Sequence, residues 1–211
     1  SDVYKRQAQF GTPLFVYDED HIRRRCQEAV KAFPDGVSYA SKAFLCKAIA
    51  KLVHEEGMGL DVATIGEAYI ALQSGVPASD LTLHGNNKSM EELRYAVDNG
   101  IGKVVIDSFD EIDKIEHLYA TTKTPIKALV RVTPGVEAYT HKYVTTGQVD
   151  SKFGFTVQNG QAGKAIERAR SSGAIDLIGL HAHIGSQIFT SDSFRKSTDI
   201  LVKLAEHFGL T

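Results

Sequence analysis

Val37-Ser38-Tyr39-Ala40-Ser41-Lys42-Ala43 contains a short predicted strand and the residues that connect it to a predicted amphipathic helix. The strand is expected to cover Val37 to Ser41, so Lys42 stands at its carboxyl end. In a barrel of parallel strands, this is the end at which the chemistry takes place. Small or apolar neighbours would desolvate the Lys42 amine and leave it able to form a Schiff base. The alternative is an ordinary strand-end lysine that reaches out to solvent.

Short β-rich runs alternate with helical ones from this stretch onward. The expected strands are nearly continuous apolar runs, typical of strands buried on both faces of a parallel sheet; they cover residues 37–41, 59–63, 81–85, 104–107, 128–133 and 177–183. Three helices are predicted to begin at capping boxes, Thr64 with Glu67, Ser89 with Glu92, and Ser108 with Glu111. Further helices are expected at 19–33 and 191–208. About six βα units therefore follow one another without a break in composition.

Repeated βα units fit either a doubly wound sheet or a (β/α)8 barrel. Polar residues favour the barrel, because they stand at or just past the carboxyl ends of successive strands: Lys42, Asp61, His84 with Asn86, Asp107, Arg131 and His183. A doubly wound sheet would concentrate such groups near one switch point. We therefore predict an α/β fold of the (β/α)8 TIM-barrel type. A barrel needs eight strands and roughly 250 residues, so we expect this one to be truncated after about six βα units.

Composition places the chain among ordinary globular proteins. It has 211 residues, of which 43% are hydrophobic and 24% charged, and its net charge of -2 gives no sign of a nucleic-acid or membrane partner. Cys26 and Cys46 lack a metal-ligand pattern, so we expect buried free thiols in a reducing cytoplasm. No apolar run approaches a transmembrane span. Residues 1–7 look like a foreign or disordered leader, which leaves 8–211 as the partial barrel domain.

Four motifs occur along the chain in a specific order: Tyr39-Ala40-Ser41-Lys42-Ala43, His84-Gly85-Asn86-Asn87-Lys88-Ser89, Asp150-Ser151-Lys152-Phe153-Gly154 and His181-Ala182-His183-Ile184-Gly185-Ser186-Gln187. Together they resemble the amino-terminal barrel of the fold-type III pyridoxal-phosphate-dependent decarboxylases. The resemblance runs from about Phe10 to the end of the chain. It is strongest to the branch that converts meso-diaminopimelate to L-lysine and carbon dioxide. Ornithine or arginine decarboxylation and a non-enzymatic pyridoxal-phosphate-binding barrel are the alternatives.

The resemblance implies pyridoxal 5'-phosphate as the cofactor. It makes Lys42 the residue that forms the Schiff base with the cofactor, and it places His183 against a face of the pyridine ring. It also implies that Ser186 donates to the cofactor phosphate. Each residue has a structural alternative, because His183 could be a satisfied strand-end histidine and Ser186 a turn former.

Asp61 and Arg131 match the polar pair that flanks the Schiff base and the phenolic oxygen of the ring in the same family. The structural alternatives are that Asp61 closes a turn and that Arg131 belongs to an ion pair. Glu67 is most simply the capping partner of Thr64.

Residues 134–160 are too many for an ordinary βα connection, and the resemblance implies that they lie over the active site. His141-Lys142-Tyr143 and Gln187 favour the diaminopimelate branch over ornithine decarboxylase. The family's glycine-rich phosphate loop, the acid that pairs with the pyridine nitrogen and the carboxy-terminal β-domain are not found in this sequence. The full-length enzyme is expected to be a cytoplasmic homodimer, and residues 1–211 alone to be neither a closed barrel nor a competent decarboxylase.

A metal-dependent hydrolase is the rival of different chemistry. His181 and His183 lie two residues apart on a strand, so they face one side and could bind zinc, with Asp61 or His84 completing the site. Such hydrolases usually carry the pair on the first strand, whereas here it lies on the last one predicted. We therefore expect no metal.

Overall fold

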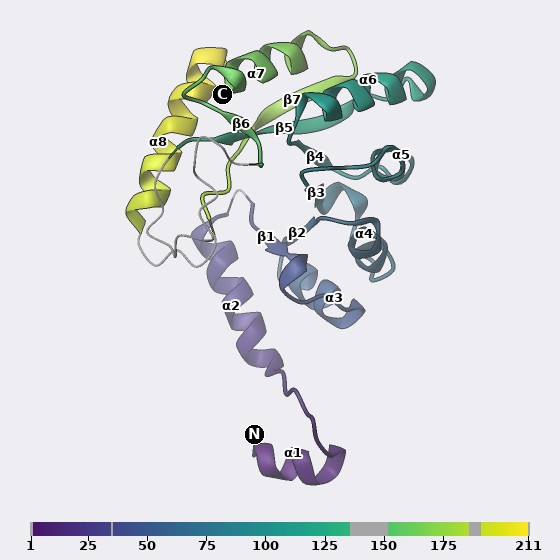
Figure 1. The fold of residues 1–211 in the computed structure, drawn as a ribbon. Helices are drawn as coiled ribbons and strands as arrows, with labels where there is room; N and C mark the ends of the chain where they lie inside the picture. Colours follow the sequence, from purple (N-terminus) through teal and green to yellow (C-terminus); the bar gives the residue numbers. More distant parts are fainter. Residues whose placement is uncertain (1, 35, 136–151, 186–190, 211) are drawn as a thin grey trace.

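A computed structural model describes residues 2–34, 36–135, 152–185 and 191–210 (Figure 1). The strands are β1 (Ser38–Ala40), β2 (Gly59–Val62), β3 (Leu81–Leu83), β4 (Lys103–Ile106), β5 (Ile126–Thr133), β6 (Phe155–Thr156) and β7 (Ile175–His181). The α-helices are α1 (Val3–Phe10), α2 (Glu19–Ala32), α3 (Lys47–Glu55), α4 (Ile65–Leu72), α5 (Met90–Asn99), α6 (Phe109–Thr122), α7 (Gln161–Ser171) and α8 (Ser191–Phe208), and two short 3-10 helices are η1 (Ser41–Ala43) and η2 (Ala78–Asp80).

All the described strand pairs are parallel. The sheet runs β1-β2-β3-β4-β5, and β5 also pairs with both β6 and β7. The six predicted strands are therefore confirmed as β1 to β5 and β7, although several are shorter than expected. The two-residue strand β6 was not predicted. Six successive parallel strands with intervening helices are the arrangement of a (β/α)8-type barrel, in which eight such strands close the sheet.

Helices α3 to α6 lie on one side of the strands, as Figure 1 shows. They bury apolar faces against the sheet, and α3 contributes Ile49, Leu52 and Val53 to the core. Leu60, Val62, Leu81, Leu83, Val104 and Ile106 come from β2, β3 and β4 and are at most 3% exposed. Burial of strand residues beneath a layer of helices is what the continuous apolar runs predicted.

Only one of the three predicted capping boxes is complete. Ser89 and Glu92 bond reciprocally at the start of α5. Thr64 and Ser108 accept from the expected amides, but the carboxylates of Glu67 and Glu111 reach one residue further back. Glu67 accepts from the Ala63 amide at 2.6 Å, and Glu111 accepts from the Asp107 amide at 2.8 Å. The two glutamates thereby stabilise the strand-to-helix turns that precede α4 and α6.

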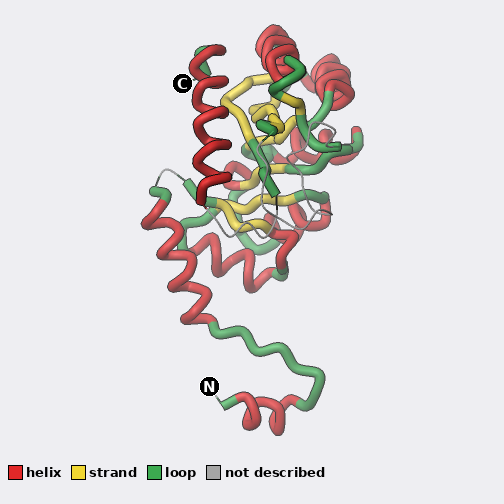
Figure 2. The backbone as a smooth tube through the Cα atoms, turned by 60° about the vertical axis from the view of Figure 1, so that its left-hand side comes forward, coloured by secondary structure: helices red, strands yellow, loops and turns green. Residues whose placement is uncertain are grey.

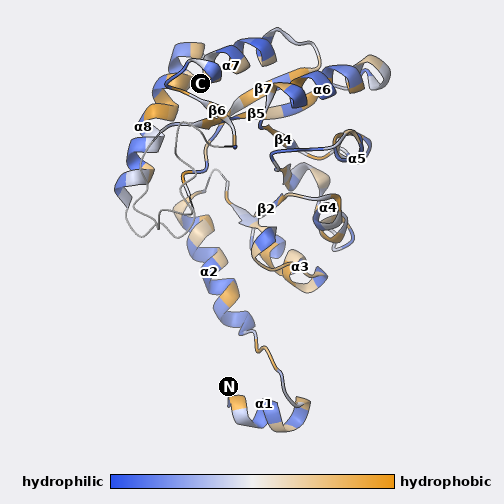
Figure 3. Cartoon of the chain, viewed as in Figure 1, coloured by the Kyte–Doolittle hydropathy of each residue, from blue (hydrophilic) through white to orange (hydrophobic). Residues whose placement is uncertain are grey.

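The amino-terminal helix α1 stands away from the rest of the chain (Figure 2) and buries no residue. An extended, largely hydrophobic segment joins it to α2 (Figure 3), and Phe15 in this segment is 86% exposed. The foreign origin of residues 1–7 stays a prediction, although residues 3–7 are helical. Both cysteines are free thiols, but only Cys26 is buried, so the expected burial of Cys46 is wrong. No described helix is long and apolar enough to cross a membrane.

Candidate active site

The carboxyl ends of the strands surround a cavity of about 420 Å³. Its wall includes four of the five residues to which the sequence resemblance assigns roles: Lys42, Asp61, Arg131 and His183. They come from η1 after β1, from β2, from β5 and from the segment after β7. The fifth, Ser186, lies outside the described residues, as does the His141-Lys142-Tyr143 motif.

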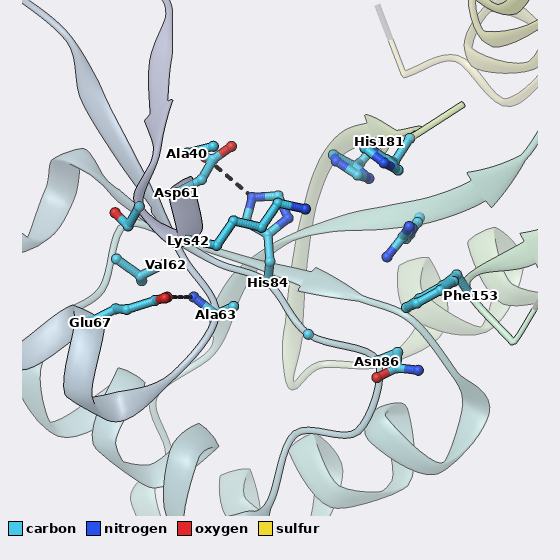
Figure 4. Close-up of a pocket in the computed structure, with 14 residues that line it drawn as sticks. Ala40, Lys42, Asp61, Val62, Ala63, Glu67, His84, Asn86, Phe153 and His181 are labelled. Carbon is cyan, nitrogen blue, oxygen red and sulfur yellow. Dashed lines mark hydrogen bonds and ion pairs between the residues drawn. The ribbon is translucent and has the colours of Figure 1, made fainter. Parts of the chain in front are cut away.

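Lys42 is exposed, so the predicted desolvation of its amine is wrong for this structure. Ala43 is also exposed, and Phe44 is 38% exposed. The cause is the position of β1, which ends the sheet order and pairs only with β2 in the described part of the chain. The Lys42 side chain nevertheless borders the cavity (Figure 4).

Asp61, His84 and His181 form a contiguous polar wall. His84 Nε2 lies 3.2 Å from Asp61 Oδ1, close enough for an ion pair but not aligned for a hydrogen bond (Figure 4). The rings of His84 and His181 meet edge to face, with centroids 5.1 Å apart. Burial lowers the pKa of His181 to about 3, and His84 and Arg131 add to the effect by charge repulsion. His181 is therefore a neutral imidazole at physiological pH.

His183 also has a lowered pKa. Burial is the main cause, and the positive charges of Arg131 and Lys42 add to it. A half-buried imidazole that lines the cavity is able to pack against a planar ligand there.

Arg131 is held in place by a buried carboxylate. Its Nη1 lies 3.1 Å from Asp107 Oδ1, and Asp107 Oδ2 accepts from the Gly154 amide at 3.0 Å. The Phe153 ring covers the guanidinium, with its centroid 4.6 Å from Arg131 Cζ. Arg131 is thus both a member of an ion pair, as its structural alternative proposed, and a residue of the cavity wall.

His84, His181 and Phe153 line the cavity, and Asp107 binds Arg131 there, but none of the four was predicted as a site residue. His84 and Asp107 were recognised as strand-end polar groups, His84 and His181 also as possible zinc ligands, and His84, His181 and Phe153 as members of motifs. The positions of His84 and Asp107 at strand ends were the usable signal. No signal of that kind marked Phe153, because it reaches the cavity from a long connection.

A phosphorylated aromatic aldehyde fits this cavity. Its volume lies within the usual range for small-molecule sites, and Lys42 offers an amine at its rim. Three buried polar atoms of the wall have no hydrogen-bond partner among the described residues: Ser41 Oγ, His84 Nε2 and His181 Nδ1. Such atoms suit a polar ligand that supplies the partners. Within the described ranges, no three His, Cys, Asp or Glu residues are arranged to hold a metal ion.

Comparison with known proteins shows which family the chain resembles. The family described as "Pyridoxal-dependent decarboxylase, pyridoxal binding domain" matches residues 19–209. The diaminopimelate decarboxylase of Bacillus subtilis (strain 168) is 48% identical over 207 residues, which are 96% of this chain and 47% of that protein. The chain thus spans about half the length of the curated relatives it matches.

Solved structures agree with the sequence relatives. Diaminopimelate decarboxylase from M. jannaschii, in complex with L-lysine, superposes with a TM-score of 0.88 at 31% identity, over 99% of this chain and 51% of that one. A lysine/ornithine decarboxylase from Vibrio vulnificus, in complex with putrescine, gives a TM-score of 0.78 at 25% identity, over 99% of this chain and 53% of its own. The family match covers most of the chain, and the chain therefore belongs to the pyridoxal-dependent decarboxylases, whose pyridoxal binding domain it carries.

Proposed function

We propose that the complete protein carrying this chain decarboxylates meso-diaminopimelate to L-lysine and carbon dioxide with pyridoxal 5'-phosphate. The observation that carries the proposal is the cavity into which Lys42, Asp61, Arg131 and His183 converge from four strand ends. The identity to diaminopimelate decarboxylases supports the choice of substrate. When bound, pyridoxal phosphate supplies an electron sink for the pair of electrons left behind by the departing carboxylate.

Each residue of the cavity has a proposed task. Lys42 would hold the cofactor through its amine, which its exposed position leaves accessible to a substrate. His183 would pack against the cofactor ring as a neutral imidazole. Asp61 and Arg131 would flank the bond to Lys42 and the phenolic oxygen of the ring, and Asp107 fixes the guanidinium of Arg131. Ser186 would donate to the phosphate.

Borohydride reduction of the cofactor-loaded complete protein tests the assignment of Lys42. Reduction makes the bond to the cofactor permanent, and peptide mass mapping should then find the adduct on Lys42. Lys42→Arg keeps the positive charge and should lose the adduct, whereas Lys47→Arg, on the exposed side of α3, should keep it. An adduct on Lys47, Lys88 or Lys152 in the parent protein would refute the assignment.

The substrate is tested by carbon dioxide release from meso-diaminopimelate, ornithine, arginine and lysine. The structural likeness to a lysine/ornithine decarboxylase is the reason to include the smaller diamino acids. Fastest turnover of meso-diaminopimelate is the expected result. Cofactor binding without any carbon dioxide release would favour the non-enzymatic pyridoxal-phosphate-binding barrel.

The location and assembly of the complete protein are also proposed. We infer a cytoplasmic protein, because a reducing compartment keeps the two free thiols Cys26 and Cys46 reduced. We infer a homodimer from the resemblance to the fold-type III family. Sedimentation of the purified complete protein tests the dimer, and fractionation of the host cell tests the location.

A further inference from the structure

Lys88 and Glu111 form a buried ion pair behind the cavity. Their side chains are 2% and 1% exposed, and Lys88 Nζ lies 3.0 Å and 3.1 Å from the two Glu111 carboxylate oxygens. Lys88 comes from the turn before α5, and Glu111 from the first turn of α6. A pair this deeply buried adds little net stability, because desolvation of the two charges offsets their attraction. Its position in the fold suggests a more specific task.

On one side the pair holds the turn after β3. Lys88 Nζ donates to the carbonyl oxygen of Gly85 at 2.6 Å. Gly85 has φ of +121°, a conformation that residues with side chains rarely adopt. His84, Gly85 and Asn86 all line the cavity. The Lys88 ammonium therefore fixes a turn that requires glycine and whose residues form part of the cavity wall.

On the other side the pair reaches Arg131 through Asp107. Glu111 accepts from the backbone amide of Asp107 at 2.8 Å and from that of Lys88 at 3.2 Å. The Asp107 carboxylate in turn binds Arg131 and the Gly154 amide. One buried carboxylate thus connects the turn after β3, the turn after β4 and, through Asp107, a cavity residue on β5.

We propose that the Lys88–Glu111 pair is a positioning pair for the cofactor cavity, which sets the Gly85 turn and the Asp107–Arg131 pair at a fixed separation. The proposal rests on the proposed function only in taking pyridoxal phosphate as the ligand. Neither residue lines the cavity, so the pair acts through Gly85, Asp107 and Arg131. Its loss should weaken the binding of pyridoxal phosphate even when the fold is as stable as before.

The double variant Lys88→Met/Glu111→Leu separates positioning from simple stability. Apolar side chains of similar size replace both charges, so no unpaired charge is left buried. Any fall in the urea midpoint then reports only the backbone groups that lose their partners, which are the Gly85 carbonyl and the amides of Asp107 and Lys88. We expect amide hydrogen exchange at Asp107 and Gly154 to be at least tenfold faster in the cofactor-free complete protein. The dissociation constant for pyridoxal phosphate should rise at least tenfold.

Arg168→Met is the matched control, because it breaks an ion-pair cluster with Asp113 and Glu116 on the outer surface. Neither the exchange rates nor the cofactor affinity should change in this variant. Should the double variant fail to fold, Lys88→Gln/Glu111→Gln is measured in its place, because two neutral amides of similar volume leave no unpaired charge buried, and changes in the same direction are expected.

Exchange rates and cofactor affinity equal to those of the parent would overturn the proposal, as would faster exchange with unchanged affinity. The exchange measurement needs no cofactor. A parent protein that binds no pyridoxal phosphate would refute the proposed function, and the exchange rates would still show whether the pair fixes the Asp107 turn.

Discussion

His84 and His181 meet edge to face at 5.1 Å, although β4 and β5 lie between the strands β3 and β7 that carry them to the cavity. Neighbouring strands lie about 4.8 Å apart, so three steps across a flat sheet would separate the two positions by roughly 14 Å. The ring contact therefore requires a curled sheet with both side chains on its concave side. This curvature, which is that of a barrel, gathers residues from distant parts of the sequence into one cavity.

His181 is predicted to link folding stability to pH. Its pKa is about 3 in the folded chain, mainly because of burial, against a usual value of 6.5. Between these values the unfolded chain binds more protons, so stability is complete above about pH 6.5 and is lost as the pH falls toward 3. The free energy of unfolding of the parent should therefore fall between pH 7 and pH 5. In His181→Gln it should fall less, and the two falls should differ by up to ~1.4 kcal/mol per pH unit.

Urea unfolding of the complete protein at both pH values measures this difference. The control is His117→Gln, since His117 is exposed on α6 and should leave the pH dependence of the parent unchanged. An equal loss of stability in the parent and both variants would contradict the prediction.

Gly154→Ala is predicted to destabilise the cavity wall. Gly154 has φ of +68°, and an added Cβ would lie 2.8 Å from the carbonyl oxygen of Arg131. Strain and this clash together should lower the free energy of unfolding by about 1–3 kcal/mol and disturb the Asp107–Arg131 pair. Gly75→Ala is the control for strain alone, because Gly75 has φ of +86° with no atom within 4 Å of the added Cβ. Equal losses of stability in the two variants would show that the contact with Arg131 is unimportant.

Ser89→Ala is predicted to weaken the start of α5. Its hydroxyl accepts from the Glu92 amide at 3.1 Å in the complete capping box. Loss of such a cap typically costs ~1 kcal/mol, which chemical denaturation can measure. Ser171→Ala is the matched control, because that serine ends α7 and bonds the carbonyl of its own helix. Its replacement should change stability little, and a loss as large as that of Ser89→Ala would contradict the capping argument.

Features that depend on local sequence were predictable. Apolar runs located the six main strands, and Ser89 with Glu92 marked the start of α5, because a strand period and a cap are each encoded within a few residues. Polar residues at strand ends pointed to the cavity for a similar reason. Parallel strands present their carboxyl ends at one edge, so Asp61, His84 and Arg131 had to lie near one another.

Features that depend on long-range contacts were not predictable. Lys88 and Glu111 pair across 23 residues of sequence, and the motif that contains Lys88 does not indicate that its side chain is buried in an ion pair. Lys42 is exposed because β1 ends the order of the described strands and pairs only with β2. Its apolar neighbours in sequence do not indicate this position. A two-residue strand such as β6 has no periodicity, and only its pairing with Val132 and Thr133 defines it.

The open edges of the sheet lead to the last prediction, which concerns residues 1–211 studied alone. Among the described strands, β7 pairs only with β5, so the other side of its backbone is open to a further strand. Ile178 on this strand is 44% exposed. An apolar edge of this kind should make the isolated chain self-associate. Ile178→Lys should reduce the association, because a charged side chain disfavours edge-to-edge pairing.

Val202→Lys is the matched control, since Val202 is 48% exposed but lies on the helix α8, whose backbone groups do not pair with strands. Sedimentation velocity over a range of concentrations measures the association of all three chains. We expect concentration-dependent oligomers for the parent and Val202→Lys, and a clear shift toward monomer for Ile178→Lys. A monomeric parent at every concentration would show that the edge of β7 is protected. An equal shift in both variants would mean that net charge, and not the strand edge, controls the association.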